Sequence, residues 1–389
     1  MSKSSSPGIV LAIILATGAG SCNAESPAPV ADPQAALASR PSAPRPAGSE
    51  CEVGGVPGPA WSQSPAAAEG WDQAILEGAW EKARQAHYAS GMLIYRGRVI
   101  GQFGDVTRPY QTRSIRKGML NAVVGQLVAE GNIDLNATLA DLGIDDVPPL
   151  TAAEKQATVR DLLMSRSGVY HEAAYFVATP GSPRPPRGSA AHGEQYWYNN
   201  WDFNVMGVIA EKAGGASIYD LFRRGVAVPT GMQDFGPEVA SYKREPEHSI
   251  HPAFLFDMST RDRARLGLLY LNGGCWNGHQ VVGADWVRES TSPLSDRAAI
   301  NSPDYGYLWW SQRGVGDMTG RLIMARGVAH QYITLIPEAD AVLVVTNDMD
   351  RPGWMNWIRT RTGMAPRQED YGAVLKDVVR ARPRNAPPA

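Results

Sequence analysis

The chain lacks an excess of charge of either sign. Its 389 residues include 37 lysines and arginines and 39 aspartates and glutamates, which leaves a net charge of −2 at pH 7. Proteins that bind nucleic acid or anionic membrane surfaces through charge carry a clear excess of basic residues. We therefore expect no nucleic-acid partner and a small molecule as the ligand. Hydrophobic residues make up 43% of the chain, enough for one large globular body.

The chain also lacks an apolar run long enough to span a membrane. Residues 9–20 form a run of about 12 residues, whereas a spanning helix needs about 20. This run follows a weakly basic start and ends in small residues, which is typical of a signal peptide, here residues 1–22. The residues before Cys22 resemble a lipobox, where a lipoprotein is cleaved and lipidated, although simple cleavage near Ala24 fits equally well. Both interpretations predict an exported protein, either periplasmic or anchored at the cell envelope through a lipid on Cys22.

Cysteine is scarce, with three in the chain. Besides Cys22 there are Cys51 and Cys275, which can form a disulfide in an oxidising compartment or remain two independent thiols. No group of His, Cys and Asp has metal-ligand spacing, so we expect neither a metal nor another cofactor. A G-x-S-x-G nucleophile elbow is missing as well, which argues against an α/β-hydrolase.

Residue composition divides the chain into four segments. After the signal peptide, residues 23–64 are dominated by Ala, Pro, Ser and Gly, a composition that predicts a tether. Residues 65–385 carry the apolar patterns of a folded body, and residues 386–389 are predicted to be a disordered tail. The body is therefore where we expect the chemistry.

Strand-like runs lie near both ends of the body, with helical patterns between them. GMLIYRGRVIGQFG predicts a hairpin that turns at Arg96 and Gly97. Further strand-like runs fall within residues 305–346, and a closing helix is expected over residues 370–382. Residues 135–290 show mainly helices and long loops. These patterns predict an α+β fold, in which both ends of the body complete one sheet around an inserted, mainly α-helical region.

The spacing of Ser114 and Lys117 suggests a nucleophile and its base. Ser114 starts a predicted helix, where the helix dipole and free backbone N–H groups favour negative charge. Lys117, three residues later, shares a helix face with Ser114 and could accept its proton if burial lowers the lysine pKa. No other lysine in the chain follows a serine at this spacing. A helix cap with a solvated lysine would nevertheless give the same pattern.

Two further segments carry groups suited to acyl transfer. Tyr198 and Asn200 precede a predicted amphipathic helix; a tyrosine hydroxyl can relay a proton, and an amide can hold a lysine or a carbonyl. Further on, Gly327 enters a strand and would let a substrate lie against its edge. The next N–H, that of Val328, could form an oxyanion hole with the N–H of Ser114.

These three segments, in this order, resemble the family of class C serine β-lactamases, penicillin-binding peptidases and related esterases and amide hydrolases. The first motif is S-x-x-K at Ser114, the second is Y-x-N at Tyr198, and the third is a degenerate K-T-G at Ala325. The similarity extends over about residues 75–350, including VRDLLMSRSGV and YGYLWW. It implies a β-lactamase-like fold with an antiparallel sheet flanked by helices from both termini.

The resemblance also implies a reaction that needs no cofactor. Lys117 takes the proton of Ser114, which attacks the carbonyl of a small ester or amide, and Tyr198 protonates the leaving group. Water then releases the acyl-enzyme. The implied substrate-binding residues are Asn200, Arg326, Gly327 and Val328.

The sequence departs from the family pattern at two places. The third motif has Ala325 and Arg326 where β-lactamases carry the lysine and hydroxyl residue that hold the antibiotic carboxylate. Gly118 also replaces a small hydroxyl residue after Lys117, a change expected to affect packing alone. The first departure favours an esterase or amidase over the alternatives, which are a β-lactamase or peptidoglycan D,D-peptidase and a weakly catalytic penicillin-binding or sensor protein.

Overall fold

The computed structural model describes residues 51, 55–176, 182–295, 303–349, 354–355, 358–359, 362 and 365–384. The predicted signal peptide, Cys22, most of the predicted tether and the predicted tail lie outside the described residues.

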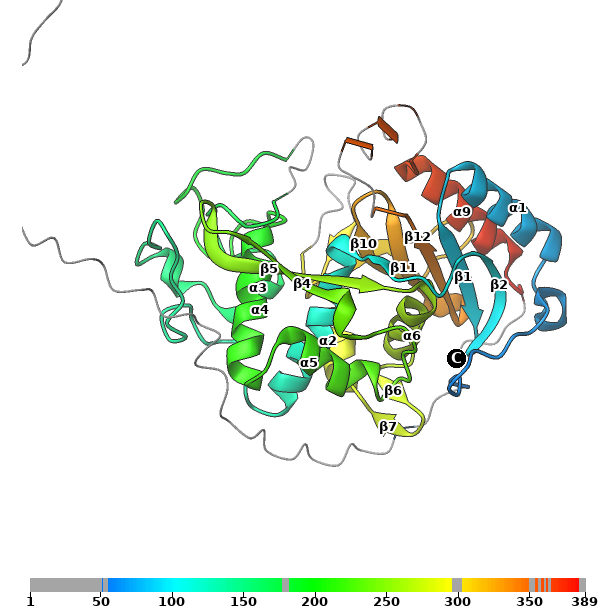
Figure 1. Cartoon of the computed structure of the whole chain (residues 1–389), viewed down its shortest axis with the longest axis horizontal. Helices are drawn as coiled ribbons and strands as arrows, with labels where there is room; N and C mark the ends of the chain where they lie inside the picture. Colours follow the sequence, from blue (N-terminus) through cyan, green and yellow to red (C-terminus); the bar gives the residue numbers. More distant parts are fainter. Residues whose placement is uncertain are drawn as a thin grey trace, which may run out of the picture.

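A seven-stranded antiparallel sheet runs through the body (Figure 1). Its strand order, β2-β1-β12-β11-β10-β9-β8, brings the two ends of the body together where β1 pairs with β12. The predicted hairpin between β1 and β2 is confirmed, because Arg96 and Gly97 both have the positive φ that a two-residue turn requires. The strands are β1 (Ser90–Tyr95), β2 (Arg98–Gly104), β8 (Asp304–Tyr305), β9 (Trp310–Arg313), β10 (Arg321–Gly327), β11 (Gln331–Ile336) and β12 (Ala341–Thr346).

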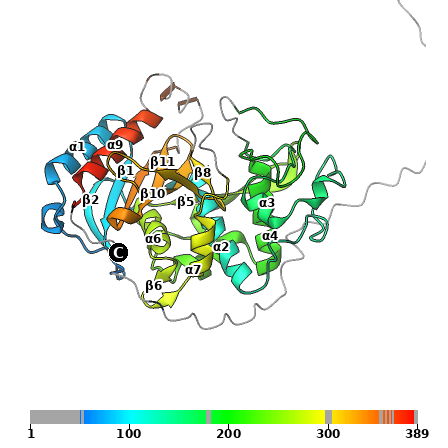
Figure 2. The same ribbon diagram turned by 180° about the vertical axis from the view of Figure 1, so that it is seen from behind.

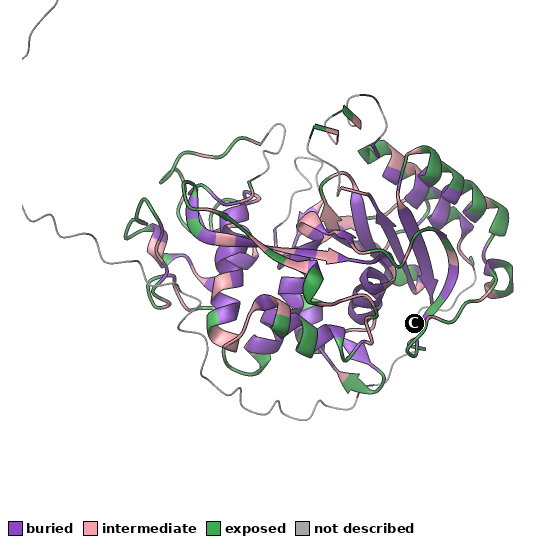
Figure 3. Ribbon diagram, viewed as in Figure 1, coloured by how far each residue is buried: buried purple, intermediate pink, exposed green. Residues whose placement is uncertain are grey.

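Helices cover both faces of this sheet. On one face, α1 (Gln73–Gln85) and α9 (Gln368–Ala381) lie side by side, while α6 (Thr260–Leu271) packs on the other (Figures 1 and 2). Every residue of β1, β11 and β12 is buried, as expected for strands that are covered twice (Figure 3). Gly267 lets α6 approach closely, because a Cβ there would lie 2.6 Å from Cγ1 of Val342. The predicted α+β fold, with helices from both termini, is confirmed.

The inserted region is mainly helical, and α2 packs against α4, α5 and α7 (Figure 2). Among the described residues, no helix combines the length and hydropathy needed to cross a membrane. The helices are α2 (Arg116–Ala129), α3 (Val159–Leu163), α4 (Asn200–Gly214), α5 (Ile218–Phe222) and α7 (Ala284–Ser290), with 3₁₀ turns η2 (Ala66–Glu69), η3 (Arg113–Ile115), η4 (Glu154–Gln156), η6 (Pro237–Val239) and η8 (Pro337–Ala339) and a π turn, η5 (Arg223–Ala227). A small sheet has the strand order β3 (Tyr110–Gln111), β5 (Ser249–Met258), β4 (Ala240–Glu245). A separate pair consists of β6 (Cys275–Trp276) and β7 (His279–Gln280).

The segment before residue 65 is attached to the body. Cys51 and Cys275 form a disulfide with a Cα separation of 6.0 Å, which answers the question that the sequence left open. Arg265 donates to the carbonyls of Gly58 and Pro59 at 2.8 and 3.0 Å, and its guanidinium lies over the ring of Trp61. The folded body therefore begins before residue 65. A glycine and a proline make these contacts through their backbone carbonyls, which composition alone does not reveal.

Candidate active site

Ser114 lies in η3, the single turn that leads into α2. Thr112 fixes this turn to β5, since its backbone N–H and its hydroxyl both donate to the carbonyl of Phe256, at 2.9 and 2.7 Å. Arg113 has a φ of 51°, a left-handed conformation that costs a residue with a side chain about 1 kcal/mol or more. Such strain is common at functional sites, and here it shapes the turn that presents the partly exposed Ser114.

Lys117 links the first two motifs. Its Nζ lies 2.9 Å from Oγ of Ser114, 2.6 Å from the hydroxyl of Tyr198 and 3.1 Å from Oδ1 of Asn200. Nζ of Lys117 therefore contacts both the serine hydroxyl of η3 and the side chains at the start of α4. The structure brings together four of the predicted site residues, although 81 residues separate Lys117 from Tyr198.

The protonation states of Lys117 and Tyr198 are shifted in opposite directions. Burial lowers the pKa of Lys117 well below its usual value, and the positive charge of Arg116 lowers this pKa further. Burial raises the pKa of Tyr198, although a hydrogen bond with Ser114 and the nearby arginines oppose that rise. Lys117 is thus the group that loses its proton more readily, while Tyr198 keeps its own.

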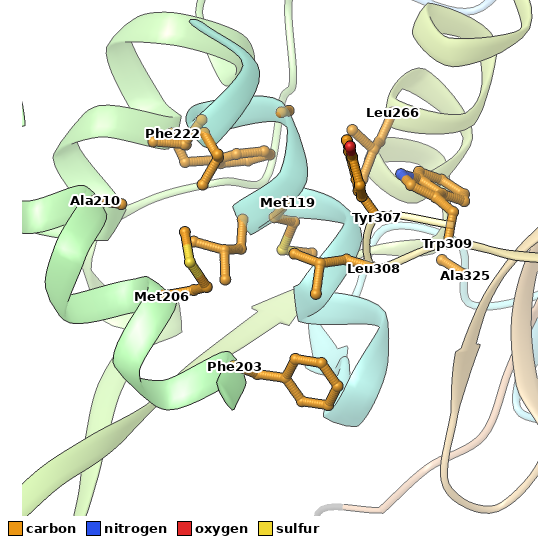
Figure 4. Packing of buried hydrophobic residues seen from close by; sticks show 14 of the residues in the cluster. Met119, Phe203, Met206, Ala210, Phe222, Leu266, Tyr307, Leu308, Trp309 and Ala325 are labelled. Carbon is orange, nitrogen blue, oxygen red and sulfur yellow. The ribbon is translucent and has the colours of Figure 1, made fainter. Parts of the chain in front are cut away.

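Aromatic rings enclose this pair of groups. The ring centroid of Tyr198 lies 5.0 Å from that of Phe203 and 5.5 Å from that of Trp310. Nζ of Lys117 lies 4.4 Å from the centroid of Phe203. Rings around an amine leave little room for water, which accounts for the desolvation that lowers the lysine pKa. Figure 4 shows Phe203 at the start of α4, close to α2.

Asn199, between the two members of the Y-x-N motif, holds that motif in place. Its side-chain Oδ1 accepts from the N–H of Trp201 at 3.2 Å and so caps α4. Its Nδ2 donates to the carbonyl of Val169 at 2.7 Å, and its backbone N–H donates to Oγ of Ser165 at 3.0 Å. The segment VRDLLMSRSGV is therefore the support of the second motif. The sequence offered the capping pattern as a signal but no sign of the long-range partners.

Asp202 completes this support and was not predicted from the sequence. Its Oδ1 accepts from Oγ of Ser167 at 2.6 Å and from Nδ2 of Asn199 at 2.8 Å, while Oδ2 is buried without a partner. Burial raises the pKa of Asp202 well above its usual value. Burial therefore favours the protonated form of this carboxyl group beneath the Y-x-N motif.

The third motif divides its side chains between the two faces of β10. Ala325 is buried, and a Cβ on Gly118 would lie 3.6 Å from its Cβ and 3.1 Å from the ring of Trp309 (Figure 4). Gly118 thus serves close packing of α2 on this strand. Arg326 is partly exposed, and its guanidinium lies 5.1 Å from the ring centroid of Trp310. The same guanidinium lies 5.6 Å from the ring centroid of Tyr332, and its charge opposes the rise in the pKa of Tyr198.

Gly327 permits a close approach of β10 to the turn that carries Ser114. A Cβ at this position would lie 3.0 Å from the carbonyl oxygen of Thr112. Cγ of Gln331 would lie closer still, at 2.7 Å, so the atoms that meet a side chain here belong to this chain itself. The expected contact of Gly327 with a substrate stays a prediction. Val328 follows in the turn after β10, and its side chain is 43% exposed.

No candidate metal site accompanies this geometry. Within the described ranges, no group of three or more His, Cys, Asp and Glu residues is placed to hold a metal ion. The polar atoms that meet at Lys117 belong to a hydroxyl, a phenol and an amide. These groups suit proton transfer and nucleophilic attack.

Comparisons with known proteins agree with this arrangement. A model of the β-lactamase family matches residues 83–357. The 6-aminohexanoate-dimer hydrolase of Paenarthrobacter ureafaciens is 28% identical over 131 residues, a match that spans 32% of this chain and 30% of that relative.

Solved structures show the same fold. The octameric penicillin-binding protein homologue from Pyrococcus abyssi has a TM-score of 0.55 at 20% identity, covering 75% of this chain and 78% of that chain. The class C β-lactamase from Rhodobacter sphaeroides has a TM-score of 0.54 at 15% identity, covering 79% and 98%. These likenesses confirm the predicted β-lactamase-like fold.

The raised pKa of Asp202 can be tested by the pH dependence of protein stability. Its raised pKa means that the folded state retains a proton that the unfolded state releases, so its contribution to stability is full at low pH and is lost as pH rises through the folded pKa. Asp202→Asn should therefore be at least as stable as the unmodified protein at pH 8 and gain less from acidification. Asp202→Ala leaves Ser167 and Asn199 without their acceptor and should lose about 1–3 kcal/mol. Urea unfolding at pH 5 and pH 8 measures both, and a large loss in Asp202→Asn would show that the carboxyl is ionised.

Proposed function

The chain belongs to the β-lactamase family of serine hydrolases, and we propose that Ser114 is its acylated nucleophile and Lys117 the base that activates it. The observation that carries this proposal is the contact of 2.9 Å between Nζ of Lys117 and Oγ of Ser114 in a buried site. A neutral amine at this distance can accept the hydroxyl proton as the oxygen attacks a carbonyl carbon.

The remaining steps follow from the neighbouring groups. The serine oxygen bonds to the carbonyl carbon, and the N–H groups of Ser114 and Val328 stabilise the oxyanion that forms. Tyr198, which lies 2.6 Å from Lys117, passes the proton to the leaving group as its bond to carbon breaks. Water then attacks the carbonyl carbon of the acyl-enzyme while Lys117 accepts a proton from it. The bond between this carbon and Oγ of Ser114 breaks, the proton passes from Lys117 to Oγ, and the acid product leaves. No cofactor enters this reaction.

The proposed substrate is a small ester or amide. The relative from Paenarthrobacter is named a 6-aminohexanoate-dimer hydrolase, which supports hydrolysis of a small substrate of this kind. In this chain, Ala325 takes the place of the lysine that grips the carboxylate in β-lactamases, and its small side chain is buried against α2. Nη2 of Arg326 donates to Oε1 of Gln368 at 3.3 Å, a hydrogen bond that competes with a grip on the carboxylate in place of that lysine. We propose Asn200, Arg326, Gly327 and Val328 as the residues that contact the substrate.

Export to the cell envelope is also proposed. The disulfide between Cys51 and Cys275 supports it, because such bonds persist in oxidising compartments and are rare in the cytosol. A lipid on Cys22 would provide the sole membrane attachment.

Ser114→Ala should abolish covalent labelling by a fluorophosphonate probe, because the variant has no attacking oxygen. Lys117→Ala should remain folded and lose most of its esterase activity, since it lacks the base. Active-site labelling and initial rates measure the two effects. Persistent labelling of Ser114→Ala would assign the nucleophile elsewhere, and near-normal rates in Lys117→Ala would make Tyr198 the base.

A short-chain nitrophenyl ester should be hydrolysed better than a chromogenic cephalosporin. A lost charge-assisted hydrogen bond to the carboxylate costs about 1.5–3 kcal/mol, so the ratio of kcat/KM should be about 10- to 100-fold. Steady-state rates on one preparation measure it. If the cephalosporin is preferred and Arg326→Met removes that preference, Arg326 has taken over the carboxylate. A single stoichiometric burst with both substrates would instead indicate a sensor protein.

Mass spectrometry of the mature N-terminus tests export. We expect a lipidated cysteine at position 22, because small residues precede Cys22 as in a lipobox. An unmodified N-terminus near Glu25 would indicate a soluble periplasmic or secreted protein, and an intact Met1 would contradict export.

A further inference from the structure

Arg116, the residue directly before Lys117, is a buried cation that has no counterion among the described residues. Its side chain belongs to the first turn of α2, and the residue is 1% exposed. Its one hydrogen bond among the described residues runs from Nη1 to the carbonyl oxygen of Arg113 at 3.4 Å, while Nε and Nη2 are buried with no partner. No carboxylate of the described residues forms an ion pair with it.

The surroundings of Arg116 compensate its charge weakly. The guanidinium lies 5.2 Å from the ring centroid of Phe254 and 5.6 Å from that of Tyr175, so aromatic faces take the place of carboxylates. A buried charge that lacks a partner is strongly destabilising, whereas well-packed apolar replacements of buried ions are often neutral or stabilising. Stability of the fold therefore gives no reason for an arginine at this position.

A second cation follows it immediately. Lys117 is equally buried and also lacks a carboxylate partner among the described residues. Burial lowers the pKa of Lys117, and the positive charge of Arg116 lowers it further. Where water is excluded, repulsion between two positive charges favours loss of a proton from one of them. Guanidinium is far more basic than an amine, and the lysine is the group that yields.

We infer that Arg116 is a positioning residue for the proton of this site: its fixed, unpaired charge keeps the Lys117 amine neutral and so available as the base. This inference rests on the proposed function, since it explains how Lys117 can accept a proton at neutral pH. Arg116 itself does not touch the reacting atoms.

The other groups around the pair do not cancel this effect. Those facing Lys117 are the hydroxyl of Ser114 from η3, the phenol of Tyr198 and the amide of Asn200 from α4. The acid nearest in α4, Asp202, is bonded to Ser167 and Asn199, and burial raises its pKa well above the usual value.

The groups facing Arg116 likewise include no ionised acid. They are Arg113 from η3, the phenols of Tyr175 and Tyr198, and Tyr219 from α5. Glu245 of β4 lies near Tyr175, where it accepts from the backbone N–H at 2.7 Å, and it makes its ion pair with Lys243. From β10, Arg326 adds one more positive charge near Tyr198.

The test compares Arg116→Met with the unmodified protein over a range of pH. Activity requires neutral Lys117, so kcat/KM for a neutral nitrophenyl ester should rise as pH rises through the pKa of Lys117. Removal of the cation raises that pKa, and the acid limb should move up by about one pH unit or more, with about tenfold lower activity below it. At high pH, the two proteins should have similar activity. The thermal midpoint of Arg116→Met should be unchanged or higher, because a buried unpaired charge has been removed.

Arg113→Met is the matched control. It removes the same charge from the same turn, but Arg113 is partly exposed and its guanidinium is bonded to the hydroxyl of Tyr175. Water screens such a charge, so the acid limb should move much less than in Arg116→Met.

Three outcomes would overturn the inference. They are an acid limb that does not move in Arg116→Met, a loss of activity that is equal at every pH, and an equal shift in both variants. An equal loss with a lower thermal midpoint would make Arg116 structural, and a rise in KM alone would make it a substrate contact. Fluorophosphonate labelling tests the proposed function separately. If Ser114 is not the nucleophile, the Ser114→Ala variant is still labelled, and this result does not depend on the behaviour of Arg116→Met.

Discussion

The site depends on one nitrogen that has been removed from water. Nζ of Lys117 contacts Ser114, Tyr198 and Asn200, which come from two elements far apart in the sequence. Each contact is possible because α2 lies between the sheet and the helical region, with α4 on one side and β10 on the other. If any of these layers were displaced, water would reach the amine and restore its proton. The packing of the fold and the chemistry of the site are thus set by the same buried helix.

Tight packing between α2 and β10 explains the two departures from the family motifs, at Gly118 and at Ala325. The absence of a side chain at Gly118 leaves room for the ring of Trp309, and Ala325 lies beside it. Lysine in place of Ala325 would have to project into this packed layer or displace Trp309. The departure at the third motif and the departure after Lys117 therefore belong to one local change, in which apolar packing replaces polar groups between α2 and β10.

The sequence predicted the fold class, the hairpin at Arg96 and the closing helix, because each depends on local patterns. It also predicted which residues meet at Lys117, and it did so through resemblance, since 81 residues separate Lys117 from Tyr198. It missed Asn199 and Asp202, whose partners lie about 30 residues away in a segment with no distinctive composition. Burial decides the roles of these side chains, and burial of a polar residue cannot be read from its neighbours in the sequence.

The near-zero net charge of the whole chain conceals a strong local imbalance. Arg113 and Arg116 flank the turn that carries the nucleophile, and neither forms an ion pair within the described part of the chain. Acyl transfer develops negative charge twice, on the serine oxygen as it loses its proton and on the carbonyl oxygen as it is attacked. Fixed positive charges stabilise both without rearrangement, because they are held before the substrate arrives. A carboxylate placed to neutralise them would make the resting protein more stable and the transition state less so, and burial raises the pKa of Asp202, the acid beneath the site, well above its usual value.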